Sequence, residues 1–153
     1  MEIKRINSDE RNLAVDLFNQ YRVFYQQPSD PALADAYLQK RLQNGESIVF
    51  VALEDVDGTA TPLGFTQLYP IYSSVRATKN WILNDLFVDA KHRGKGVGEQ
   101  LIKTAMEFAR SEGARFVQLE TAADNRIAQQ LYERIGFQKQ SPDPDFLLYR
   151  IQV

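Results

Sequence analysis

The stretch "LFVDAKHRGKGVGEQLI", residues 86–102, runs from an apolar, strand-like segment through a glycine-rich loop into a helix-like segment. Three of its glycines alternate with other residues: Gly94, Gly96 and Gly98. At the start of a helix the first N–H groups have no backbone partner and carry the positive end of the helix dipole. Glycines let a phosphate approach that backbone closely, and Arg93 and Lys95 add positive charge. The stretch therefore predicts a loop that binds a phosphate or a pyrophosphate.

Two better-known phosphate-binding loops do not match this stretch. A Walker A loop needs Ser or Thr after its lysine to hold magnesium, and here Gly96 follows Lys95. A Rossmann fingerprint has the spacing G-x-G-x-x-G, whereas this loop has G-x-G-x-G. Taken alone, the stretch is equally compatible with a charged glycine turn that binds no ligand.

The segments around the loop alternate between helical and strand-like hydrophobic periodicity. Helices are predicted near residues 9–25, 32–42, 97–113 and 126–135. Strands are predicted at residues 2–6, 47–54, 63–72, 81–88, 115–121, 136–139 and 145–151. This order contains a central meander and at least one β-α-β crossover. It indicates a mixed α/β (α+β) fold, in a chain whose length suits a single domain over residues 1–153.

The composition excludes several classes of site. The chain has no cysteine, which rules out thiol nucleophiles, disulfides and thiolate metal sites, and its one histidine, His92, cannot form a multi-histidine zinc site. We therefore expect no metal. The net charge of −2 gives no general attraction to nucleic acid. No apolar run approaches the ~20 residues of a membrane span and no signal peptide follows Met1, so we expect a cytoplasmic protein without a membrane partner.

Two motifs carry a resemblance to a known family. Residues 86–102 resemble the central motif of the GNAT superfamily of N-acetyltransferases, where an Arg/Gln-x-x-Gly-x-Gly/Ala loop holds the pyrophosphate of acetyl-coenzyme A. Residues 125–137, "NRIAQQLYERIGF", resemble the family's second motif. The resemblance implies a GNAT-like fold, with a mixed central sheet of about seven strands flanked by about four helices. It also implies acetyl-CoA as the cosubstrate.

The resemblance assigns cofactor-binding residues to the loop and to the strand before it. In the loop these residues are Arg93, Gly94, Lys95, Gly96, Val97 and Gly98. In the strand they are Leu86, Phe87 and Val88. In the family, the strand's backbone pairs with the pantetheine arm, and an N–H there polarises the thioester carbonyl, as in an oxyanion hole.

Two residues of the second motif match functional residues of the family. Tyr132 matches the tyrosine that protonates the departing coenzyme A thiolate in many GNAT enzymes, although it also shares an apolar helix face with Leu131 and Ile135. Asn125 matches a cofactor contact of the family, and asparagine is also a favourable N-cap for the helix that follows.

The strand "LNDLFV", residues 83–88, is similar to the corresponding strand of diamine (spermidine/spermine) acetyltransferases. Those enzymes have a Glu-Asp pair where this chain has Asn84-Asp85, so the glutamate proposed as their base is absent. Strand alternation places Asp85 on the face of Leu83 and Phe87, and a bulge would change this arrangement. Asn84 and Asp85 are both candidate catalytic residues, either of which could reach the acceptor. Asp85 is either a base or amine anchor with a raised pKa, or the partner of an arginine that holds the fold.

Aromatic residues of the first predicted helix indicate what kind of amine accepts the acetyl group. In the family this region forms a wall of the acceptor pocket, which here implicates Tyr21, Phe24 and Tyr25, although each ring taken singly is more readily explained as core. Aromatic faces attract ammonium groups, so we expect a small cationic amine such as a polyamine. The alternatives are a peptide or protein amine, an amino acid or a drug, a catalytically silent acyl-CoA sensor, and a domain that binds another nucleotide. The apolar segment 145–153 predicts a homodimer, since an apolar edge strand needs covering.

Overall fold

The computed structural model describes all 153 residues, which form two compact units, Met1–Glu120 and Thr121–Val153. The strands of the first unit are β1 (Glu2–Ile6), β2 (Ile48–Val56), β3 (Thr59–Ser73), β4 (Thr78–Val88) and β5 (Val117–Gln118). Its helices are α1 (Val15–Phe24), α2 (Pro31–Gln43) and α3 (Val97–Ser111), with short 3-10 helices η1 (Ser8–Leu13) and η2 (Ala90–His92). The second unit contains α4 (Arg126–Ile135). A helix able to span a bilayer is not found in the chain.

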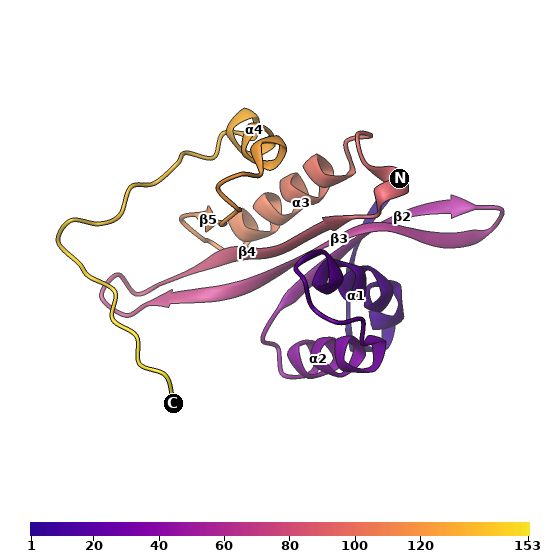
Figure 1. Cartoon of the computed structure of the whole chain (residues 1–153), viewed down its shortest axis with the longest axis horizontal. Coiled ribbons are helices and arrows are strands. Elements are labelled where there is room, and N and C mark those ends of the chain that lie inside the picture. The colour runs from indigo at the N-terminus through magenta and orange to yellow at the C-terminus, as the bar shows by residue number, and fades with distance from the viewer. The chain divides into compact units, whose positions relative to one another are not determined.

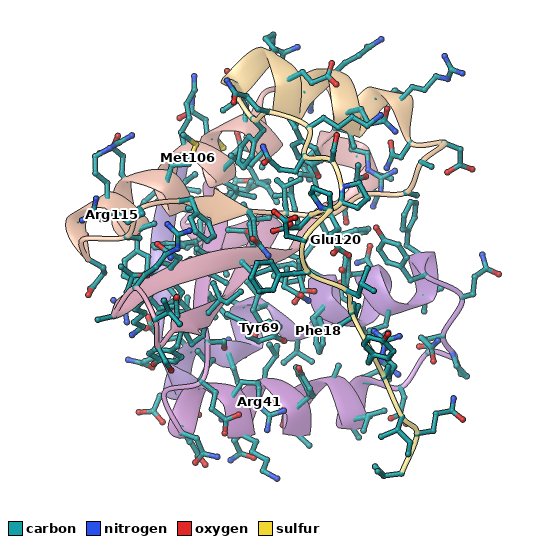
Figure 2. The ribbon with its side chains drawn as sticks, turned by 90° about the vertical axis from the view of Figure 1, so that its left-hand side faces the viewer. Phe18, Arg41, Tyr69, Met106, Arg115 and Glu120 are labelled. Carbon is teal, nitrogen blue, oxygen red and sulfur yellow. The ribbon has the colours of Figure 1, made fainter.

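The sheet has the order β1-β2-β3-β4-β5, and all neighbours are antiparallel except β4 and β5, which are parallel. In the first unit, α1 and α2 cover one face of this sheet and α3 covers the other (Figure 1). Figure 2 shows Phe18, Tyr69 and Arg41 on the first side and Met106 of α3 on the second. The predicted fold class, with a mixed sheet, a meander and four α-helices, is confirmed.

The main core lies between the sheet and the pair α1 and α2. Its buried members are Ile6, Ala14, Leu17, Phe18, Ala34, Leu38, Val49, Val51, Leu53, Phe65 and Phe87. β2 is buried from Val49 to Leu53, as its continuous apolar run predicts for a strand covered on both faces. On the other side, α3 buries a face that includes Val97 and Leu101, and the ring of Phe108 packs against Trp81 with centroids 5.1 Å apart.

The turn between β2 and β3 is a tight hairpin turn at Asp57-Gly58. Asp57 and Gly58 both have left-handed backbone, with φ of 53° and 80°. Two such residues in succession fit the right-handed twist of the flanking strands. Further along β3, Pro70 pairs with Trp81 of β4 but lies beyond Leu68, where pairing with β2 ends. The missing N–H of Pro70 therefore costs no hydrogen bond of the sheet on the β2 side.

Two of the seven predicted strands are wrong, and a third is shorter than predicted. Residues 136–139 and 145–151 form no strand, and the predicted strand at 115–121 contains only Val117–Gln118. An apolar run becomes a strand only where another strand accepts its hydrogen bonds. The segment after α4 has no such partner in the structure.

Candidate functional site

The predicted phosphate loop has an open backbone surface. Gly94 and Gly96 take left-handed φ values of 74° and 81°, and a Cβ built at either position would meet no atom within 4 Å. Gly96 is the N-cap of α3 and supplies no side-chain cap. The N–H groups of the first turn of α3 are therefore left for an outside acceptor. The loop fits an anion with several oxygens, such as a pyrophosphate.

The side chain of Arg93 fastens the loop to the end of β4. Its Nε donates a hydrogen bond to the backbone oxygen of Val88 at 2.9 Å, and its guanidinium carbon lies 5.4 Å from the centroid of the Phe87 ring. The positive charge thus lies beside the strand that the sequence predicts to hold the cofactor. The predicted residues Phe87, Val88 and Arg93 are confirmed as neighbours, whereas their contact with a cofactor stays a prediction.

β3 approaches the end of β4 closely at Gly64. A Cβ at Gly64 would lie 2.8 Å from the carbonyl oxygen of Phe87 and 3.2 Å from the Cα of Val88. Contacts shorter than 3 Å with backbone require the backbone to move. Glycine at this position therefore sets the course of β4 where it leads into the loop.

A β-bulge separates Asn84 from Asp85. Gln67 pairs with Asp85, and the next residue of β3, Leu68, pairs with Leu83, so that Asn84 is left without an opposite residue. Asn84 is exposed, whereas Asp85 is buried. Bulges of this kind re-aim side chains next to functional sites.

The bulge corrects the predicted placement of Asp85. Simple alternation would put Trp81, Leu83, Asp85 and Phe87 on one face. In the structure Trp81 packs against Phe108 of α3, whereas Phe87 belongs to the core beneath α1 and α2. Asp85 consequently shares the face of Phe87 and not that of Leu83. A bulge depends on the partner strand, so the sequence of β4 alone could not locate it.

Asp85 is held by neutral donors only. Its side chain is 3% exposed, and it accepts hydrogen bonds from Nε2 of Gln67 at 2.5 Å and from Nδ2 of Asn84 at 3.0 Å. Within residues 1–120 the ion pairs involve other side chains, so the predicted alternative of an arginine partner is wrong. Burial raises the pKa of Asp85, and the hydrogen bonds from Gln67, Asn84 and Tyr21 oppose that increase. The result is a carboxylate that lacks a counter-ion.

The three predicted acceptor aromatics form a connected group on α1. The Tyr21 ring lies 5.0 Å from that of Tyr25, which lies 5.1 Å from that of Phe24. Phe24 and Tyr25 are 54% and 49% exposed, so the interpretation of these two rings as core is wrong. Tyr21 is half-buried, and its hydroxyl donates to the backbone oxygen of Asn84 at 3.4 Å. The group therefore reaches the bulge.

A cavity of 470 Å³ lies between α1, the loop that follows it and the end of β4. It is lined by Asn19, Gln20, Val23, Phe24, Ser29, Phe87 and Arg93. Ligand sites commonly have volumes of about 300–1,000 Å³. The cavity brings Phe24, predicted for the acceptor, next to Phe87 and Arg93, predicted for the cofactor. Another cavity, of 490 Å³, lies beside Trp81 and Lys79 at the start of β4 and contains none of the predicted residues.

Three polar residues near the bulge, Tyr37, Thr66 and Gln67, were missed by the sequence analysis. Tyr37 and Tyr69 share a hydrogen bond of 2.7 Å between their hydroxyls, and burial, then Tyr37, then the charge of Asp85 raise the pKa of Tyr69. The hydroxyl of Thr66 donates to the backbone oxygen of Asp85 at 2.8 Å, and Gln67 binds its carboxylate. The available signal was a pair of polar residues, Thr66 and Gln67, inside the apolar strand "LGFTQLY".

Asn125 and Tyr132 belong to the second unit. The side chain of Asn125 accepts a hydrogen bond from the N–H of Ala128 at 3.2 Å, which confirms it as the N-cap of α4. Tyr132 is half-buried, and its ring lies 6.0 Å from that of Phe137. Their roles in cofactor binding and proton transfer stay predictions.

Comparisons with known proteins show the family of this chain. The family model described as the Acetyltransferase (GNAT) family matches residues 14–137. An uncharacterized N-acetyltransferase of Bacillus subtilis, YhfO, is 40% identical, and the match covers 100% of this chain and 98% of the relative. A solved structure of a probable acetyltransferase is 36% identical with a TM-score of 0.87, covering 100% of this chain and 98% of that one.

A more distant solved structure is the aminoglycoside N-acetyltransferase AAC(6')-Iy in complex with CoA. It is 22% identical, has a TM-score of 0.77 and covers 99% of this chain and 95% of that one, which supports the fold alone. Acetyltransferases with this fold use acetyl-CoA. On the match over most of its length and on its close relatives, the chain belongs to the Acetyltransferase (GNAT) family and is an acyltransferase.

Proposed function

We propose that the protein transfers the acetyl group of acetyl-CoA to a primary amine of a small, polyamine-like cation by direct attack on the thioester. The observation that carries this proposal is the buried carboxylate of Asp85, which has neutral hydrogen-bond donors and no cation. A buried charge needs a partner of opposite sign. The ammonium group of the acceptor is that partner.

The glycine loop and the end of β4 would hold acetyl-CoA, which supplies an activated acetyl group. The backbone of Gly94–Gly98 and the first turn of α3 would bind the pyrophosphate, because their N–H groups have no cap and the space in front of Gly94 and Gly96 is open. The backbone of Leu86–Val88 would pair with the pantetheine arm. Asn125, which matches a cofactor contact of the family's second motif, would also contact the cofactor.

Asp85 would receive the acceptor in two steps. The carboxylate first binds the ammonium, and it then accepts one of its protons, because burial has raised the pKa of Asp85 toward that of a general base. The neutral amine left behind is the nucleophile. Holding amine and thioester in attack geometry can supply about 7–11 kcal/mol of the barrier.

Tyr132 would protonate the departing thiolate. A phenol with a pKa near 10 can give its proton to a thiolate whose acid has a pKa of about 8.5, although this transfer is not downhill. The second proton that the attacking nitrogen must lose would restore the phenol, so that an amide and the CoA thiol leave. Support for this role comes from the matching position of Tyr132 in the family's second motif.

The aromatic group Tyr21, Phe24 and Tyr25 would form the wall along which the acceptor lies. Ammonium groups bind aromatic faces within about 6 Å of the ring centroid, at roughly 0.5–2 kcal/mol each. Because two of these rings are exposed, a second ammonium of a polyamine would bind there while the first binds Asp85.

The test is release of free thiol from acetyl-CoA in the presence of separate amines. The panel contains putrescine, spermidine, an amino acid, an aminoglycoside and a lysine-containing peptide, and the product is identified by mass. We expect turnover with the polyamines and little with the amino acid. Turnover confined to the peptide or the amino acid would contradict the proposed acceptor. CoA binding without turnover on any amine would favour a sensor, and stronger thermal stabilisation by ATP than by CoA would contradict the cosubstrate.

A further inference from the structure

Gln67 is a glutamine in the interior of β3 with no solvent exposure. Glutamine is rarely buried completely, because its amide needs several hydrogen-bond partners. The Nε2 group of Gln67 donates to Oδ2 of Asp85 at 2.5 Å, and the two residues are opposite each other in the β3–β4 pairing. The pairing shifts by one residue directly after Gln67, so its side chain meets the carboxylate at the bulge itself.

The orientation of the Gln67 amide is set by Asp85. Its Oε1 atom is buried and has no hydrogen-bond partner in the chain. The flipped amide would place Oε1 against Oδ2 of the carboxylate, which brings two acceptors together and is unfavourable. The amide therefore binds the carboxylate even though its own oxygen stays unsatisfied, a condition that a residue serving only to pack β3 would avoid.

The other hydrogen-bond donors near Asp85 are less well placed to fix its carboxylate. Asn84 donates at 3.0 Å from an exposed position, and Tyr21 of α1 is half-buried. The titratable and charged groups that face this region from the packed elements are Tyr21 of α1, Tyr37 and Arg41 of α2, Tyr69 of β3 and Arg93 over the Phe87 ring. Arg41 pairs with Glu46 and lies over the ring of Tyr37, so it gives Asp85 no direct ion pair.

We propose that Gln67 is the positioning residue of Asp85: its buried amide fixes the carboxylate in one rotamer and keeps it ionised, so that the remaining lone pairs face the acceptor amine. This inference rests on the proposed role of Asp85. A carboxylate oxygen accepts more than one hydrogen bond, and each oxygen here has one donor from Gln67 or Asn84. A charged acceptor strengthens the bond to Gln67, and burial keeps water from replacing it.

The test uses Gln67→Met, which keeps the length of the side chain and removes the donor. We expect the Asp85 carboxyl carbon, followed by 13C NMR, to titrate at higher pH than in the wild type. The acid limb of the pH profile of kcat/KM should also shift to higher pH. On that limb kcat/KM should be about tenfold lower than in the wild type, as expected for the loss of one hydrogen bond to a charged group. Well above the limb, the rate should return to within a few-fold of the wild-type value.

Gln67→Glu is the second variant, because it preserves shape and can fold where Gln67→Met does not. Two carboxyl groups this close share a proton, so their joint titration should lie higher still. Gln43→Met, at the exposed end of α2, is the matched control and should leave the titration unchanged.

An unchanged Asp85 titration in Gln67→Met, or in Gln67→Glu if the first variant does not fold, would overturn the inference. An equal loss of kcat/KM at every pH would also overturn it, because that is the effect of a purely structural residue. The NMR titration needs no acceptor, so it remains decisive for Gln67 even if no amine is acetylated and the proposed function fails.

Discussion

A single buried carboxylate, that of Asp85, reduces the stability of the protein at the pH where it is expected to act. Burial raises the pKa of Asp85 above its value in the unfolded chain. A raised pKa means that the folded state binds the proton more tightly, so the free energy of unfolding falls as pH rises from the unfolded pKa through the folded one. Such a cost is typical of a group retained for function.

We therefore expect Asp85→Asn to be more stable than the wild type near pH 8. The substitution removes the unpaired charge, and the unpartnered Oε1 of Gln67 can accept a hydrogen bond from the new amide. The gain should shrink as pH falls and disappear below about pH 4, near the unfolded pKa of aspartate, where both forms are neutral. Scanning calorimetry between these pH values measures it. A variant that is less stable than the wild type at pH 8 would contradict this view of Asp85.

Tyr132→Phe tests the proposed proton donor. Loss of a general acid commonly lowers the rate by about 10²–10⁴-fold, and we expect kcat to fall within that range while the KM for acetyl-CoA changes little. The substitution retains the ring and its contact with Phe137. Tyr72→Phe, at an exposed position, is the control. Steady-state release of free thiol measures kcat for both variants. A wild-type kcat for Tyr132→Phe would contradict the role of proton donor and show that the tyrosine only packs in α4.

At the scale of elements, the close approach of β3 to β4 at Gly64 sets the backbone position of the end of β4, which leads into the glycine loop. Gly64→Ala should push the backbone of Phe87 and Val88 away and raise the KM for acetyl-CoA. Gly45→Ala is the matched control, because its φ of 64° costs about 1–2 kcal/mol of strain while its Cβ meets nothing within 4 Å. Chemical unfolding and steady-state kinetics separate the two effects. Equal KM values in both variants would show that the approach at Gly64 has no part in binding.

The sequence predicted those elements whose signals are local. The four α-helices, the central hairpin and the glycine loop follow from apolar spacing and from residues such as Gly58 and Gly96 that permit left-handed backbone. The bulge at Asn84 and the Gln67–Asp85 bond could not be predicted, because both depend on the register between two strands. The two C-terminal strands were predicted from apolar runs alone, and a run carries no information about whether a partner strand is present.

At the scale of the whole molecule, the segment after α4 exposes an apolar surface. Its largely exposed residues include Phe146, Leu147, Leu148, Tyr149 and Ile151. Monomeric proteins rarely expose contiguous apolar patches of this kind. We propose that a homodimer covers them and expect light scattering at micromolar concentration to give twice the chain mass of 17.5 kDa. Deletion of residues 145–153 should give a monomer, and a wild-type monomer would contradict the proposal.

The most direct test of the central claim is the initial rate of acetyl transfer to a diamine by the wild type and by Asp85→Asn. CoA binding is measured in both by calorimetry, which shows that the loop of each variant is intact. The account predicts acetylated diamine from the wild type, equal CoA affinity, and a loss of about 100-fold or more in kcat/KM for Asp85→Asn, as expected when a base and anchor is removed. Equal transfer rates for the two proteins would contradict it, because the buried carboxylate would then have no part in receiving the amine.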